Sequence, residues 1–77
     1  MLRGRVRQVH FIGVGGVGMS GLAEILRTLQ FDVSGSDLRD GENTRNLRRL
    51  GVRIDLGHRA DNVHGADVVV YSSAIQS

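Results

Sequence analysis

The 77-residue sequence has a formal net charge of +2, no cysteine and a mean hydropathy of −0.11. A chain of this length can form one small domain that buries about 60% of its unfolded surface, so we expect a single modest core. The absence of cysteine excludes a disulfide framework and makes the cytoplasm the expected compartment. The ten basic residues are all arginine and are scattered, and aromatic residues make up only 4%, which argues against a nucleic-acid surface. No apolar run is long enough for a membrane span.

Hydrophobic periodicity predicts alternating strands and helices. We expect strands at residues 9–14, 31–36, 52–56 and 66–71, with helices at 19–30 and 43–50. The first helix should bury Leu22, Ile25, Leu26 and Leu29. The second should turn Leu47 and Leu50 inward and end at Gly51. The run 66–71 is almost entirely apolar and β-branched, which is typical of a central strand covered on both faces.

This alternation predicts an α/β fold: a Rossmann-like three-layer domain with a parallel sheet, truncated after about four strands. In such sheets ligands bind at the carboxyl ends of the strands. The polar loops of the sequence follow those ends, at residues 13–18, 35–37, 57–58 and 72–74. The apolar fourth strand would leave an unpaired edge, so we expect the isolated chain to self-associate.

A glycine motif lies between the first strand and the first helix. Gly13 permits the tight turn, Gly15 lets the backbone approach a ligand, and Gly18 lets the helix pack close to the sheet. Backbone amides at a helix start bind anions, so we expect the amides of Gly15, Gly16, Val17 and Gly18 to hold a diphosphate, with Met19 beginning the helix behind them. The alternative is a turn with a purely structural role.

An acid follows the glycine motif at the distance expected for a ribose-binding residue. Asp37 ends the second predicted strand and is a candidate acceptor for ribose hydroxyls, and Ser36 shares its loop. The alternative for Asp37 is an exposed carboxylate at a strand end. A P-loop needs a lysine to reach the outer phosphates, and the sequence contains none, so ATP hydrolysis by this segment is not expected.

Several segments together resemble the amino-terminal domain of the Mur ligase family. They are residues 10–13 (HFIG), 15–24 (GGVGMSGLAE), 34–37 (SGSD), 57–58 (GH) and 70–75 (VYSSAI). The resemblance covers nearly the whole chain, in the family's order, and is strongest to the members that join L-alanine to UDP-N-acetylmuramate. It implies that residues 1–77 form the UDP-substrate-binding domain of a larger ligase whose central ATPase and carboxyl-terminal domains are absent from this sequence.

The resemblance also implies a chemistry and further site residues. In the parent ligase ATP, with Mg²⁺, activates the muramoyl carboxylate as an acyl phosphate, which the amine of L-alanine attacks. No cofactor is implied for this fragment, which is not expected to be catalytic alone. The resemblance suggests His58 as a partner of the uracil, and the alternative is a solvent-facing histidine. Ser72 and Ser73 are candidate hydroxyl donors to the diphosphate, and their alternative role is to cap the segment that follows the fourth strand.

Other interpretations stay open at this point. The glycines and Asp37 fit an NAD(P)-binding domain of a dehydrogenase or a redox-sensing regulatory module equally well. A noncatalytic module with a vestigial pocket is a second alternative. A related ligase that recycles murein peptides onto UDP-N-acetylmuramate would share this domain. The three histidines are scattered and lack metal-ligand spacing, so no metal site is expected.

Overall fold

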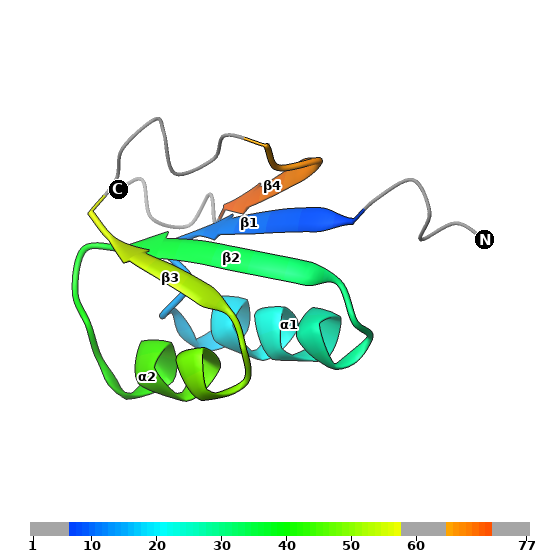
Figure 1. Ribbon diagram of the computed structural model, residues 1–77. Helices are drawn as coiled ribbons and strands as arrows, with labels where there is room; N and C mark the ends of the chain where they lie inside the picture. The colour runs from blue at the N-terminus through cyan, green and yellow to red at the C-terminus, as the bar shows by residue number, and fades with distance from the viewer. Residues whose placement is uncertain (1–6, 58–64, 72–77) are drawn as a thin grey trace.

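The structure is a computed structural model that describes residues 7–57 and 65–71 (Figure 1). Strands and helices alternate along the chain, with boundaries within two residues of those expected from the sequence. The elements are β1 (Gln8–Ile12), α1 (Val17–Thr28), β2 (Asp32–Asp37), α2 (Glu42–Arg49), β3 (Arg53–Leu56) and β4 (Val68–Tyr71).

The strands form one parallel sheet in the order β3-β2-β1-β4. In register, Ile12 pairs with Ser36 on β2 and with Tyr71 on β4, and Asp37 pairs with Leu56 on β3. The carboxyl ends of all four strands therefore meet at one edge of the sheet. This confirms the predicted α/β class and parallel sheet, and it brings the loops that follow β1 and β2 together.

Both helices lie on the same face of the sheet, below it in Figure 1. The core lies between them and the sheet and includes Phe11 of β1, Ala23 of α1 and Leu47 of α2, all essentially without solvent exposure. A second helical layer, which a three-layer domain would have, is not among the described residues.

The apolar stripe expected to bury α1 is largely on its outer side. Leu22, Ile25 and Leu29 are 42%, 57% and 54% exposed, whereas Ala23 is fully buried, with Leu26 partly buried beside it. The prediction for these three leucine and isoleucine side chains was therefore wrong. Because α1 lies against the sheet through its small residue, the bulky positions are turned away from it.

Two further expectations are corrected. Leu50 is 41% exposed, because α2 ends at Arg49 and its inward side chain is Leu47. The strand expected at the centre, β4, lies at the edge of the described sheet, next to β1, and its Val68 and Tyr71 are exposed. An exposed apolar edge is consistent with self-association, which stays a prediction.

Each helix ends in the same hydrogen-bonded turn. After α2, the amides of Gly51 and Val52 donate to Arg48 and Leu47, and Gly51 has a φ of 98°, as expected for the residue that stops a helix. After α1, the amides of Gln30 and Phe31 make the equivalent bonds. Here the left-handed position is held by Gln30, with a φ of 74°, the only non-glycine residue with positive φ in the described ranges.

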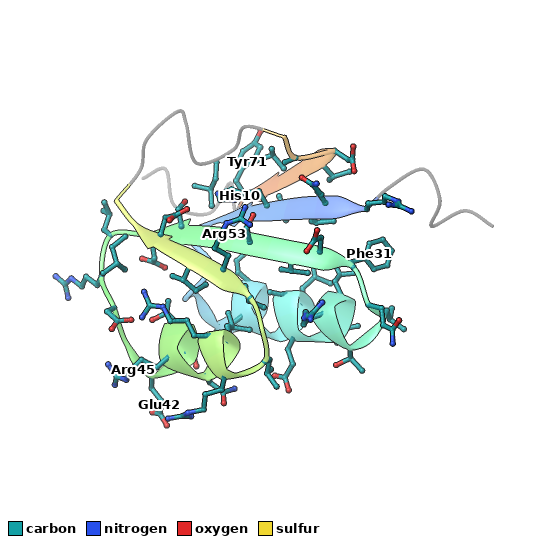
Figure 2. All side chains as sticks on the ribbon, viewed as in Figure 1. His10, Phe31, Glu42, Arg45, Arg53 and Tyr71 are labelled. Carbon is teal, nitrogen blue, oxygen red and sulfur yellow. The ribbon has the colours of Figure 1, made fainter. Side chains whose placement is uncertain are left out.

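The face of the sheet away from the helices is polar. His10 and Arg53 lie there (Figure 2), with Ser34 and Ser36 on the neighbouring strand. The His10 ring is buried, and its Nδ1 lies 2.8 Å from Ser34 Oγ, while the described residues give its Nε2 no partner. Burial lowers the pKa of His10, an effect that nearby Asp55 opposes and Arg53 reinforces.

Candidate functional site

The loop between β1 and α1 is fixed by main-chain hydrogen bonds. Gly13 has a φ of 78°, and the amides of Gly13 and Val14 both donate to the carbonyl of Ser36, at 2.8 and 3.0 Å. The amide of Gly16 then donates to the carbonyl of Gly13 at 3.1 Å. The tight turn predicted for Gly13 is therefore present, and it is attached to the end of β2.

The peptide groups on either side of Gly15 are held by one side chain at the end of β2 and one in the first turn of α2. Asp37 Oδ2 accepts the Gly15 amide at 2.8 Å, and Asn43 Nδ2 donates to the Gly15 carbonyl at 2.9 Å. The other oxygen of Asp37 accepts the Leu38 amide at 2.8 Å. A Cβ on Gly15 would lie 2.9 Å from Asp37 Oδ2, so the space that this glycine leaves is occupied by the carboxylate.

These bonds alter which amides can receive an anion. The sequence predicts diphosphate contacts at Gly15 and Gly16, but in this structure both amides are already used. Among the described residues no hydrogen bond engages the amides of Val17, Gly18 and Met19, the first turn of α1. That turn contains no acidic residue, and its cap Gly16 offers no side-chain acceptor. The amides of the first turn therefore stay available for an anion, with the Asp37 carboxylate bound to Gly15, one residue before the cap.

Gly18 does not have the packing role expected of it. A Cβ there would meet nothing within 4 Å, so this glycine is not required for close contact between α1 and the sheet. Gly35 of β2 fills that role, because a Cβ at Gly35 would lie 2.7 Å from the Cβ of Val14. The close approach is therefore between the loop after β1 and strand β2, and α1 takes no part in it.

A cavity of about 560 Å³ lies between the glycine loop and the start of α2. Its lining includes Gly15, Gly16, Asp37, Arg39 and Asn43. Asp40 and Glu42 also line it, and of these carboxylates only that of Asp40 is paired with arginines of α2, Arg45 and Arg48, among the described residues. An anionic group is therefore better placed at the start of α1 than deep in this cavity, whereas neutral hydroxyl or amide groups can bond to the carboxylate side.

The start of α2 is built around Thr44, which is buried at 1% exposure. Its hydroxyl accepts the Gly41 amide at 2.8 Å and lies 2.7 Å from Asp40 Oδ1, to which it donates. Arg48 also bonds that oxygen, at 3.0 Å. The Thr44 hydroxyl, reinforced by Arg48 and Arg45, lowers the pKa of Asp40, so this carboxylate is ionised at neutral pH.

The remaining predicted site residues are placed as follows. Ser36 is 2% exposed and contributes its carbonyl to the glycine turn. Gly57 lies at the same edge, with its amide 2.7 Å from the Asp37 carbonyl. His58, Ser72 and Ser73 lie outside the described residues, so their roles stay predictions.

Sequence reasoning missed Asn43 and Thr44, which it treated only as the first residues of a helix. Small polar residues before an apolar helical position are typical of caps, and no pattern in a single sequence says that an asparagine bonds to a loop 28 residues away.

Across the described ranges there is no cluster of three residues of metal-ligating type, and no helix there is long and apolar enough to cross a membrane.

Comparison with known proteins identifies the family. The sequence profile described as "Mur ligase family, catalytic domain" matches residues 8–77. The chain belongs to the Mur ligase family. This Mur ligase chain is 74% identical, over 99% of its length, to the UDP-N-acetylmuramate--L-alanine ligase of Sorangium cellulosum, and 53% identical over the same share to that of Persephonella marina. It spans 16% and 17% of those relatives.

Solved structures agree with the family assignment. The UDP-N-acetylmuramate-alanine ligase of Thermotoga maritima superposes with a TM-score of 0.82 at 39% identity, over 90% of this chain and 16% of that one. A murein peptide ligase of Psychrobacter arcticus gives 0.83 at 29% identity, over 91% and 15%. These findings give no support to the dehydrogenase or redox-module alternative, which we do not retain.

The family implies ATP, and the glycine loop of this Mur ligase chain can be tested for it. Its residues 13–18 have the glycine spacing of a P-loop, G-x-x-x-x-G, but Met19 stands where that motif requires lysine, followed by Ser20. Without an ammonium to reach the outer phosphates, these residues do not fit ATP. No phosphoryl-transfer step is therefore assigned to this part of the molecule.

Proposed function

We propose that this chain is the UDP-N-acetylmuramate-binding domain of an ATP-dependent ligase that joins L-alanine to that substrate in cytoplasmic peptidoglycan synthesis. The observation that carries the proposal is the 74% identity, over 99% of the chain, to a UDP-N-acetylmuramate--L-alanine ligase. The amide-lined start of α1, free of acidic residues, supports it, because a diphosphate is what such a site favours.

In this proposal the substrate lies along the carboxyl edge of the sheet. The diphosphate binds the amides of Val17, Gly18 and Met19, and the carboxylate of Asp37 retains lone pairs for a ribose or base after accepting two amides. Gly15 and Gly16 act by shaping the loop. Ser36 contributes its carbonyl to the glycine turn, and His58, Ser72 and Ser73 are the further residues proposed to contact the substrate.

The chemical step belongs to other parts of the parent ligase. There ATP with Mg²⁺ would supply the phosphoryl group that activates the muramoyl carboxylate as an acyl phosphate, with ADP as the other product. The amine of L-alanine then attacks the acyl carbon, and phosphate leaves. This chain binds and orients the UDP end of the substrate while that reaction takes place at the other end.

A titration of the ¹⁵N-labelled chain tests the proposal. UDP-N-acetylmuramate should shift the amide signals of Val17, Gly18 and Met19 most strongly, and NAD in a parallel sample should leave them unchanged. Shifts with NAD but not with the UDP-sugar, or no shift with either, would overturn the proposal for this chain. UDP alone should reproduce most of the effect, because the proposed contacts are to the nucleotide.

A further inference from the structure

We infer that Asn43 is a positioning residue for the anion-binding loop, acting through the Gly15 peptide. Its Nδ2 donates to the Gly15 carbonyl at 2.9 Å, while Asp37 accepts the amide of the same residue at 2.8 Å. Because a carbonyl can only accept, the orientation of the Asn43 amide is fixed by the contact itself. Both the amide and the carbonyl of Gly15 are thus hydrogen-bonded to side chains from outside its own loop.

The loop needs these two hydrogen bonds because its glycine-rich backbone can adopt many conformations. Four of the six residues from 13 to 18 are glycine, and glycine loses more conformational entropy on ordering than any other residue. A loop that orders only when ligand arrives subtracts that cost from the binding free energy. Holding Gly15 in advance leaves the following amides, at Val17 and Gly18, in the position that an anion requires.

Of the two side chains that bond to Gly15, the sequence pattern indicates a role for Asp37 but none for Asn43. Asp37 ends β2 and belongs to the predicted ligand loop, whereas Asn43 lies in the first turn of α2, and both residues line the cavity. The bond from Asn43 therefore also ties α2 to the loop across the cavity. Its loss should loosen the loop while leaving the helix itself intact, since Thr44 caps α2 independently.

This inference rests on the proposed function and deepens it, and a set of matched variants separates the two. Asn43→Ala removes the donor, and Asn43→Asp keeps the shape but presents a carboxylate that cannot donate when ionised. Asn46, exposed on the same helix, has no side-chain hydrogen bond among the described residues, so Asn46→Ala and Asn46→Asp make the same chemical changes away from the loop.

Two readouts are measured on the 77-residue chain: the dissociation constant for UDP-N-acetylmuramate and the hydrogen-exchange rate of the Gly15 amide. We expect Asn43→Ala to weaken binding about fivefold and to accelerate exchange by a similar factor, as for the loss of one hydrogen bond. Asn43→Asp should be at least as severe in both. The Asn46 variants should stay within about twofold of the wild type in both readouts.

If Asn43 only stabilised the fold, binding and the unfolding temperature would fall together. A positioning role predicts that they separate in Asn43→Asp: an aspartate in the first turn favours the helix dipole, so the unfolding temperature should stay near that of wild type while binding falls. Wild-type binding by Asn43→Asp would overturn the inference and leave the proposed function standing. If the wild type itself binds nothing, the proposed function fails, and unchanged Gly15 exchange in the Asn43 variants would separately overturn the positioning role.

Discussion

Val14 lies directly over Gly35, so closely that a Cβ on Gly35 would be 2.7 Å from the Val14 Cβ and 2.8 Å from each of its methyl carbons. Val14 is fully buried, and its own amide is bonded to the carbonyl of Ser36. The first turn after β1 is thus seated on the last residues of β2. The geometry of the glycine loop therefore depends on this contact as well as on its own glycines.

Gly35→Ala should therefore destabilise the chain by about 1–3 kcal/mol, because the added methyl overpacks a site that has no free volume. Val14→Ala alone also destabilises, by leaving a cavity. In the double variant the two changes should compensate in part, with a coupling of about 0.5–3 kcal/mol measured by urea denaturation. Strict additivity would show that the two residues are not in the predicted contact.

Gly15→Ala tests the hydrogen bond between the Asp37 carboxylate and the Gly15 amide. The new Cβ would lie 2.9 Å from Asp37 Oδ2 and 3.3 Å from Thr44, so the carboxylate must move away from the Gly15 amide. We expect the free energy of unfolding to fall by about 1.5–3 kcal/mol, as for the loss of a hydrogen bond to a charged group, and UDP-sugar binding to weaken. Gly21→Ala is the control: it has open space inside α1 and should stabilise by about 0.5–1 kcal/mol.

Gln30→Gly should stabilise the chain. Gln30 adopts a φ of 74° at the end of α1, a left-handed conformation that costs a residue with a Cβ about 1–2 kcal/mol. Glycine removes that cost but gains entropy in the unfolded chain, so we expect a net gain of about 0.5–1 kcal/mol in thermal or urea unfolding. The equivalent change in reverse, Gly51→Ala after α2, should destabilise; a gain there would contradict the assignment of these turns.

His10 should make stability fall in mild acid. Burial lowers its folded pKa below the ordinary 6.5, so below that value the unfolded chain binds a proton that the folded chain does not. His10 therefore leaves the free energy of unfolding at its full value above pH 6.5, and that free energy declines as the pH falls below 6.5. The unfolding temperature should drop between pH 7.5 and 5.5. His10→Gln should flatten that part of the profile, and an unaltered slope would assign the effect to another group.

Much of the fold could be predicted from residue patterns, because the strands here carry strong signals. The apolar, largely β-branched runs around Val9 and Val69 specify strands, and Gly13 and Gly51 specify turns that require positive φ. The parallel sheet followed from the alternation with helices. Those predictions depend on local chemistry, which a single sequence contains.

The errors arose where contacts between elements decide the outcome. Periodicity identified Leu22, Ile25 and Leu29 as one apolar face but could not say that α1 packs through Ala23 instead, since the distance between helix and sheet determines which side chain fits. In the same way, Asn43 matched a helix start, while its bond to the Gly15 carbonyl depends on where α2 lies. Tertiary geometry, rather than propensity, set these positions.

One consequence concerns attempts to change ligand preference. In nucleotide-binding sheets the acid at the end of the second strand is an obvious position to alter, because it is expected to meet the sugar. Here the same carboxylate holds the main chain of the glycine turn. Replacing Asp37 would change selectivity and loop shape in one step, so any redesign of this protein must supply a new acceptor for the Gly15 amide before the two properties can be adjusted separately.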